Sequence, residues 1–105
     1  AGVDRLLADP TLPAGVPLAR MVDPAMSTAM AETAHWAVLA LQRDFLDYAA
    51  QQRAAVWRQH PQRRADEWPV LVLGAGEMGR TVGDRLRANG YPVRHWRRGE
   101  DLAAA

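Results

Sequence analysis

The sequence predicts an α/β fold that contains part of a doubly wound parallel sheet. Three observations predict it: a continuous apolar run at residues 70–73, an amphipathic pattern at 78–88, and a second strand-like segment at 91–96. A continuous apolar run is typical of a parallel strand that is buried on both faces, and a helix between two strands allows them to run parallel. At 105 residues, the chain is long enough for one small domain.

The first 22 residues are rich in turn signals. Asp9-Pro10, Leu12-Pro13 and Val16-Pro17 each break any long element. Between these breaks, residues 3–8 have the composition of a short helix or a turn, and residues 16–22 that of a short strand.

A long helix is predicted to begin at Asp23-Pro24, with Asp as the N-cap and Pro at the first helical position. The pattern extends toward Trp57, with or without a break. Residues 34–41 are apolar except for His35, which predicts a helix buried from more than one side, between two domains or two subunits. The predicted apolar face carries Met30, Ala34, Val38, Leu41, Phe45 and Tyr48. A polar linker at residues 60–67 leads to the first strand.

The sequence Gly74-x-Gly76-x-x-Gly79 follows that strand directly. This is the form of a dinucleotide-binding turn in a Rossmann-type sheet. Gly74 allows a tight turn, Gly76 lets a pyrophosphate approach the backbone, and Gly79 lets the helix pack close to the strand. The free N–H groups near Glu77 and Met78 would face the anion at the positive end of the helix. The alternative is a glycine-rich turn without a ligand.

The context of the glycines favours the ligand-binding interpretation. Met78, Val82 and Leu86 recur at steps of four and form the apolar face of a helix. Asn89-Gly90 supplies a helix stop. The second strand follows, and Pro92 lies near its start, where a missing N–H is least harmful.

The tip of the second strand indicates which dinucleotide the turn would take. It reads Trp96-Arg97-Arg98, with no carboxylate before Glu100 and Asp101. A carboxylate at such a position would hold the ribose 2′-hydroxyl of NAD, whereas two guanidinium groups suit the 2′-phosphate of NADP. Trp96 or an Arg could also stack on adenine. The sequence therefore favours NADP(H) over NAD(H), and the alternative is a solvated basic turn.

Composition excludes several other functions. The net charge of +1 gives no reason to expect a nucleic-acid partner, and no apolar run reaches the length of a membrane span. The chain has no cysteine, so it has neither a disulfide nor a thiolate nucleophile. Without a visible secretory signal, we expect a cytoplasmic protein.

The sequence predicts no metal site. The histidines lack metal-ligand spacing among themselves, and each is expected to be structural or solvated rather than catalytic. Asp44 and Asp47 are one helical turn apart and are interpreted as a solvated face beside Arg43. The histidines are His35, His60 and His95.

Two strands and one connecting helix cannot cover both faces of a parallel sheet. We therefore expect these residues to be an internal piece of a larger protein.

The chain also resembles a known family, the D-isomer-specific 2-hydroxyacid dehydrogenases, and within it the glyoxylate/hydroxypyruvate reductase branch. The resemblance covers nearly all of residues 1–98. It is carried by Ala1-Gly2-Val3-Asp4, by Met30-Ala31-Glu32 on a long helix that reaches Leu41-Gln42-Arg43, by the glycine turn, and by Trp96-Arg97-Arg98.

The resemblance implies a two-domain enzyme with its active site in the cleft between the domains. Residues 1–22 would end the substrate domain, 23–68 would form an interdomain helix and linker, and 69–105 would begin the NAD(P)-binding domain. Ala1 and Gly2 would hold the substrate carboxylate, and Met30 would lie near the nicotinamide end of the cofactor. The branch typically uses NADPH and forms homodimers.

The resemblance also implies that the catalytic groups lie elsewhere. The family's catalytic Arg, acidic residue and general-acid His belong to later parts of the cofactor domain, so no catalytic residue is assigned here. The intact protein is expected to transfer hydride between the nicotinamide and a small 2-oxo or 2-hydroxy acid. The alternative is a non-catalytic nucleotide-binding or regulatory module.

Overall fold

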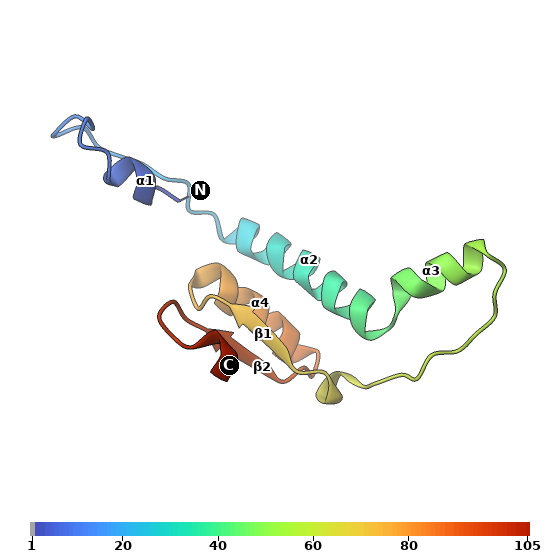
Figure 1. Ribbon diagram of the computed structural model, residues 1–105. Coiled ribbons are helices and arrows are strands. Elements are labelled where there is room, and N and C mark those ends of the chain that lie inside the picture. The colour runs from blue at the N-terminus through green and yellow to red at the C-terminus, as the bar shows by residue number, and fades with distance from the viewer. Residues whose placement is uncertain (1) are drawn as a thin grey trace.

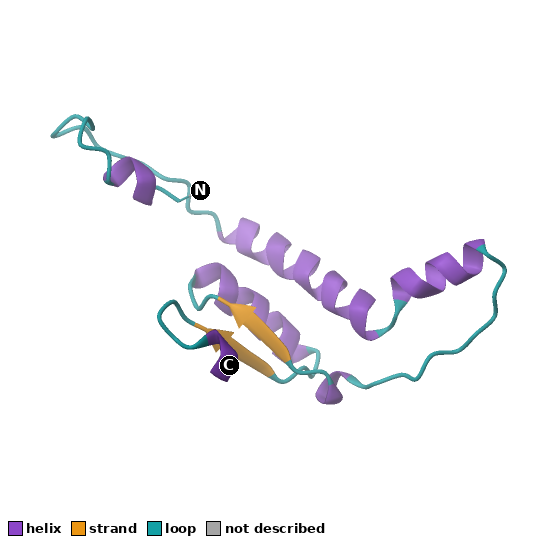
Figure 2. Cartoon of the chain, viewed as in Figure 1, coloured by secondary structure: helices purple, strands orange, loops and turns teal. Residues whose placement is uncertain are grey.

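The computed structural model describes residues 2–105 as an elongated chain (Figures 1 and 2) with principal extents of 65 × 33 × 24 Å. Its radius of gyration is 19.3 Å, compared with about 13 Å for a compact domain of this size. In chain order the elements are α1 (Asp4–Leu7), α2 (Pro24–Gln42), α3 (Phe45–Arg53), the 3₁₀ helix η1 (Ala65–Glu67), β1 (Val70–Leu73), α4 (Glu77–Ala88), β2 (Val93–Trp96) and the 3₁₀ helix η2 (Leu102–Ala104).

β1 and β2 form a two-stranded parallel sheet, and α4 connects them. The register pairs Val70 with Val93 and Leu73 with Trp96. The predicted β-α-β order and parallel pairing are confirmed, and α4 begins one residue before the predicted start.

α4 covers one face of this sheet (Figure 1) because its apolar stripe meets the side chains on that face. Val82 and Leu86 are buried there, with Val72 and Val93 packed against them. Gly90 ends the helix at φ +102°, a backbone conformation that glycine adopts without strain. Leu71, on the alternate face of β1, is exposed.

α2 lies along the outer side of α4 (Figure 1) and completes a layer of helices over the sheet. Its start is as predicted: Asp23 caps the helix by accepting a hydrogen bond from the N–H of Ala25 at 2.9 Å. The predicted apolar face is correct only in part: Ala34 and Val38 pack against the core, whereas Met30 and Leu41 are exposed. The buried positions of α2 carry small or polar residues, which allow close packing: Ser27, Ala31, Ala40 and Gln42.

The long helix is interrupted at Asp44, whose φ of 54° is left-handed. α3 starts after this break and ends at Arg53, so the expectation that the helix reaches Trp57 is wrong. Ala55 is also left-handed at φ 53°, and the N–H of Val56 donates to the carbonyl of Gln51 at 2.9 Å. This combination closes the end of a helix as a Schellman motif does.

Two further expectations concern the flanks of α2. Residues 3–8 contain the short helix α1, as one of the two predicted alternatives. Residues 16–22 form no strand, so that prediction is wrong. The division at residues 22 and 68 into parts of two domains stays a prediction. Within residues 2–105, no helix combines the length and the apolar character needed to cross a bilayer.

A buried polar link ties α2 to the sheet. Tyr91, only 2% exposed, lies between α4 and β2 and donates its hydroxyl hydrogen to Oε1 of Gln42. Nε2 of Gln42 in turn donates to the carbonyl of Arg63 at 2.8 Å. Gln42 thereby fixes the end of α2 against both the linker and the core.

Candidate cofactor site

The glycine turn leaves β1 at the carboxyl end of the sheet. Gly74 has φ +124°, which a residue with a side chain rarely adopts. Its N–H donates to the carbonyl of Trp96 at 2.9 Å, so the turn is tied to the end of β2. The chain then reverses into α4, as the sequence predicted.

Gly79 is required by close packing. A Cβ atom on Gly79 would lie 2.5 Å from the carbonyl oxygen of Gly74 and 3.6 Å from Cγ1 of Val72. The absence of a side chain therefore lets the first turn of α4 rest on the backbone of the glycine turn. This is the role that the spacing predicted for the third glycine.

Gly76 has a different environment. It is the N-cap residue of α4, and a Cβ atom there would meet nothing within 4 Å. The carbonyl of Gly76 accepts the first helical hydrogen bond, from the N–H of Arg80 at 2.9 Å. The N–H groups of Glu77 and Met78 precede that bond and have no partner within the helix. The turn thus presents open backbone donors beside open space, which suits an anion.

A second turn follows β2. The N–H of Arg97 donates to Oε2 of Glu100 at 2.9 Å, and Nε1 of Trp96 donates to the carbonyl of Glu100 at the same distance. Gly99 has φ +95° within this turn. The side chains of Arg97 and Arg98 are exposed, and neither forms an ion pair within residues 2–105.

Glu100 is a site residue that sequence reasoning missed. Its carboxylate caps the backbone of the turn and so holds the two arginines in place. The three-residue spacing from Arg97 to Glu100 is the usual spacing for a carboxylate that reaches back to an N–H, and it could have indicated this contact.

The two turns lie at the same edge of the sheet (Figure 1). This follows from the parallel register, in which Leu73 and Trp96 are paired at the ends of their strands. The predicted anion-binding turn at residues 74–79 and the predicted basic turn at 97–98 are therefore neighbours.

A cavity of about 180 Å³ joins the start of α4 to the segment before α2. Gly2 lies on its wall with Glu77 and Met78, so three predicted site residues meet there. Met30 is not among the lining residues, and Ala1 lies outside the described residues. The remaining wall is formed by Arg20, Met21, Val22, Asp23, Met26 and Ser27.

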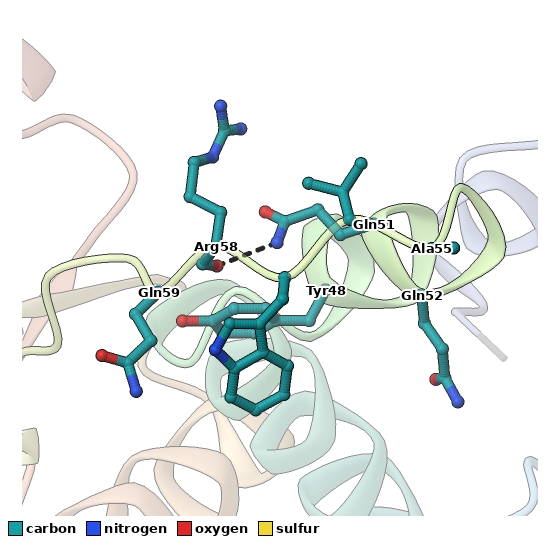
Figure 3. Close-up of a pocket in the computed structure, with 8 residues that line it drawn as sticks. Tyr48, Gln51, Gln52, Ala55, Arg58 and Gln59 are labelled. Carbon is teal, nitrogen blue, oxygen red and sulfur yellow. Dashed lines mark hydrogen bonds between the residues drawn. The ribbon is translucent and has the colours of Figure 1, made fainter.

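A larger cavity, about 670 Å³, lies elsewhere. It is an open cavity lined by α3 and by the chain that folds back after it. Tyr48 and Gln51 lie on its walls (Figure 3), and Trp57 also lines it. The amide of Gln51 donates to the carbonyl of Arg58 at 2.9 Å and holds this fold-back together. None of the predicted site residues lines this cavity.

The surroundings of Asp44 differ from the sequence interpretation. Asp44 does not belong to a fully solvated face, because its carboxylate lies 3.3 Å from Nδ1 of His60. The ligand atoms of Asp44, Asp47 and His60 lie within 4.8 Å of one another. Nε2 of His60 contacts Oε1 of Gln51, so both ring nitrogens of His60 have a protein partner. These contacts of His60 anchor the linker to the start and the last turn of α3.

Known proteins resemble this chain over almost its whole length. The family model described as "D-isomer specific 2-hydroxyacid dehydrogenase, NAD binding domain" matches residues 35–104. Glyoxylate/hydroxypyruvate reductase A from Klebsiella pneumoniae subsp. pneumoniae and its counterpart from Serratia proteamaculans are both 40% identical over 93% of the chain. The chain spans about a third of the length of these curated relatives, 33% in each case.

Solved structures agree with the sequence relatives. A D-isomer specific 2-hydroxyacid dehydrogenase from Xanthobacter autotrophicus Py2, in complex with NADPH and MES, is 38% identical with a TM-score of 0.82, over 97% of this chain and 42% of that one. An NADPH-dependent glyoxylate/hydroxypyruvate reductase from Sinorhizobium meliloti, in complex with NADP and sulfate, is 34% identical with a TM-score of 0.81, over 97% and 32% respectively.

Proposed function

We propose, because the chain belongs to the D-isomer specific 2-hydroxyacid dehydrogenase family, that it holds the pyrophosphate and adenine-ribose half of NADP(H) in a reductase of small 2-oxo acids. The observation that carries the proposal is the position of two turns at one sheet edge. One presents free helix N–H groups and the other presents two exposed guanidinium groups. A dinucleotide phosphate has anionic groups that both turns could bind.

The residues present fit this cofactor. The open space at Gly76 and the free N–H groups of Glu77 and Met78 suit the pyrophosphate. Arg97 and Arg98 have no carboxylate partner among residues 2–105, and each could form forked hydrogen bonds with a 2′-phosphate. The Glu100 carboxylate accepts the N–H of Arg97, which supports that turn instead of offering a ribose ligand.

In the intact enzyme, bound NADPH would supply a hydride to the carbonyl carbon of the substrate. This chain would bind the cofactor and orient it toward the substrate. Gly2 is proposed to hold the substrate carboxylate through its backbone together with Ala1, and Met30 to lie toward the nicotinamide. The catalytic Arg, acidic residue and His are proposed to come from other parts of the protein.

The proposed substrates are glyoxylate and hydroxypyruvate, because the curated relatives are named as reductases of these two acids. Both are small 2-oxo acids whose carboxylate needs a positively polarised partner at the site. Because the chain spans only a third of these relatives, the activity is proposed for the protein that contains it.

We also propose that this protein is a homodimer. Trp36 and Leu41 are large apolar residues of α2 that face solvent, and a second subunit would remove them from water. Sedimentation of the full-length protein would report a dimer, and a monomer at high concentration would contradict this part of the proposal.

The enzymatic proposal is tested by following NADPH oxidation with the full-length protein. We expect NADPH to be oxidised when glyoxylate or hydroxypyruvate is added, and more slowly when NADH replaces it. Failure to oxidise NADPH with any small 2-oxo acid would overturn the reductase assignment. If NADPH still bound tightly in that case, the result would favour the alternative of a non-catalytic nucleotide-binding module.

A further inference from the structure

His95 is a partly buried histidine between the sheet and α4, beside the apolar core. It lies on β2 opposite Val72 in the register, on the face of the sheet that α4 covers. The neighbouring positions on this face are apolar: Val70, Val72 and Val93. A fourth apolar residue would satisfy the packing, so the imidazole calls for an explanation beyond burial.

One ring nitrogen of His95 contacts the glycine turn. Nδ1 lies 2.9 Å from the carbonyl oxygen of Gly74. Since a carbonyl only accepts hydrogen bonds, Nδ1 must carry the hydrogen and donate it. Gly74 is then tied to β2 twice, through its N–H to Trp96 and through its carbonyl to His95.

The other ring nitrogen has no such partner. Nε2 is buried and has no hydrogen-bond partner among the described residues. It faces Gly83 of α4, where a Cβ atom would lie only 2.6 Å from it. Gly83 therefore makes the room that the ring needs. A buried polar atom without a partner costs stability, so Nε2 does not explain why a histidine stands here. The bond from Nδ1 to the carbonyl of Gly74 does.

We propose that His95, as the neutral tautomer protonated at Nδ1, is a positioning residue that holds the Gly74 carbonyl so that the glycine turn faces the cofactor pyrophosphate. The same carbonyl is the atom against which Gly79 packs, so its orientation sets where α4 begins. The backbone N–H groups of Glu77 and Met78 lie in the first turn of α4, so their direction depends on where the helix begins. The inference rests on the proposed NADP(H) site.

The main test compares two substitutions in the full-length protein. His95→Leu fills the space but removes the donor, whereas His95→Asn keeps a donor close to the position of Nδ1. We expect His95→Leu to bind NADPH roughly three- to tenfold more weakly, the size expected for one neutral hydrogen bond, and His95→Asn to recover most of that loss. Urea unfolding should find His95→Leu close in stability to the wild type, because removal of the unpartnered Nε2 offsets the lost bond to the Gly74 carbonyl.

A second variant leaves the histidine in place. Gly83→Ala puts a methyl carbon 2.6 Å from the position of Nε2, which is too close for both atoms, so the ring must move away from Gly74. We expect weaker NADPH binding in Gly83→Ala alone, and no further loss when Gly83→Ala is added to His95→Ala. Equal losses from Gly83→Ala in both backgrounds would show that its effect does not pass through His95.

The tautomer of His95 can be measured in the protein without bound cofactor. Nitrogen NMR of the full-length protein labelled with ¹⁵N-histidine should show His95 protonated at Nδ1, opposite to the form that free histidine prefers. Protonation at Nε2, or unchanged NADPH affinity in His95→Leu beside a wild type that binds, would overturn the His95 proposal alone. A wild type that binds neither NADPH nor NADH would overturn the proposed function and the positioning role with it.

Discussion

At the scale of single residues, the glycines of the turn have separate physical roles. Gly79 lies against the chain's own backbone, whereas Gly76 lies beside open space. A side chain at Gly79 would therefore oppose folding, and a side chain at Gly76 would oppose only a bound ligand. The two positions can be distinguished experimentally because stability and binding are measured separately.

We expect Gly79→Ala to lower the free energy of unfolding by about 1–3 kcal/mol, the usual cost of overpacking. Gly76→Ala should leave it unchanged or raise it by up to about 1 kcal/mol, since the φ of −73° at Gly76 suits alanine. NADPH affinity should nevertheless fall roughly tenfold or more in Gly76→Ala. Urea unfolding and fluorescence titration of the full-length proteins measure the two effects. Unchanged NADPH affinity in Gly76→Ala would contradict the assigned position of the pyrophosphate.

Tyr91 gives the core a dependence on alkaline pH. Burial raises the pKa of the Tyr91 phenol above its ordinary value of 10.0, and the positive charge of Arg43 opposes part of the rise. The folded protein therefore keeps this proton at pH values where the unfolded chain loses it. The contribution of Tyr91 to stability should not change with pH below about pH 10, and it should be lost as the pH rises above 10 through the raised pKa.

Tyr91→Phe tests this directly. Below pH 10 the variant should be less stable by about 1–3 kcal/mol, because Oε1 of Gln42 loses its donor in a buried place. Above pH 10 its stability should decline less steeply than that of the wild type. Parallel curves of unfolding free energy against pH for the two proteins would contradict the assignment.

At the residue scale, the sequence predicted contacts between residues that are close together in the chain. The spacing of the glycines predicted which one packs closely, because the contact is made within six residues. It missed Gln42, Tyr91 and His95 as a set of buried polar contacts, since each partner is distant in the chain. Only the fold brings those atoms together.

At the scale of elements, the contact between α2 and α4 depends on small side chains. Ala31, 1% exposed, lies between the two helices, and Ala34 and Val38 pack beside it. Larger residues of α2 face solvent. The periodicity of large apolar residues therefore identified the helix but not its buried face, because close packing of two helices selects small residues.

Ala31→Leu should lower the free energy of unfolding by about 1–3 kcal/mol, because the interface has no room for three more carbon atoms. Ala29→Leu is the matched control: it adds the same atoms to an exposed position of the same helix and should change stability by less than about 0.5 kcal/mol. Thermal or urea unfolding measures both. Equal effects of the two substitutions would show that α2 does not pack on α4 through Ala31.

The helix–strand order was predictable because its signals are local: an N-cap, a four-residue apolar run and a helix stop. The break at Asp44 was not. Asp enters the left-handed region more readily than most residues with a side chain, but nothing in the sequence marks this Asp as one that does. The early end of α3 at Arg53 was not predictable either, because Ala55, and not a glycine, takes the left-handed position that closes the helix. Asp44 is held by its contact with His60, and Ala55 by the hydrogen bonds that close the end of α3, although alanine itself disfavours this conformation.

At the scale of the whole molecule, residues 2–105 form one small core and leave much apolar surface exposed. The core lies between α2, α4 and the sheet, whereas the fold-back after α3 extends away from it (Figure 1). Trp57 in that segment is 92% exposed. An arrangement of this kind suits a chain whose outer faces are covered by other parts of an enzyme or by a second subunit.

The central claim is that the edge of the sheet binds NADP(H) through both turns. It is tested most directly by titrating the full-length protein with NADPH and NADH, as wild type and as Arg97→Asp/Arg98→Ala. A control, Arg53→Asp/Arg58→Ala, makes the same change in net charge at exposed positions far from the turns. We predict that the wild type and the control prefer NADPH, and that the Arg97/Arg98 variant loses this preference and favours NADH. Unchanged NADPH affinity in that variant would contradict the account.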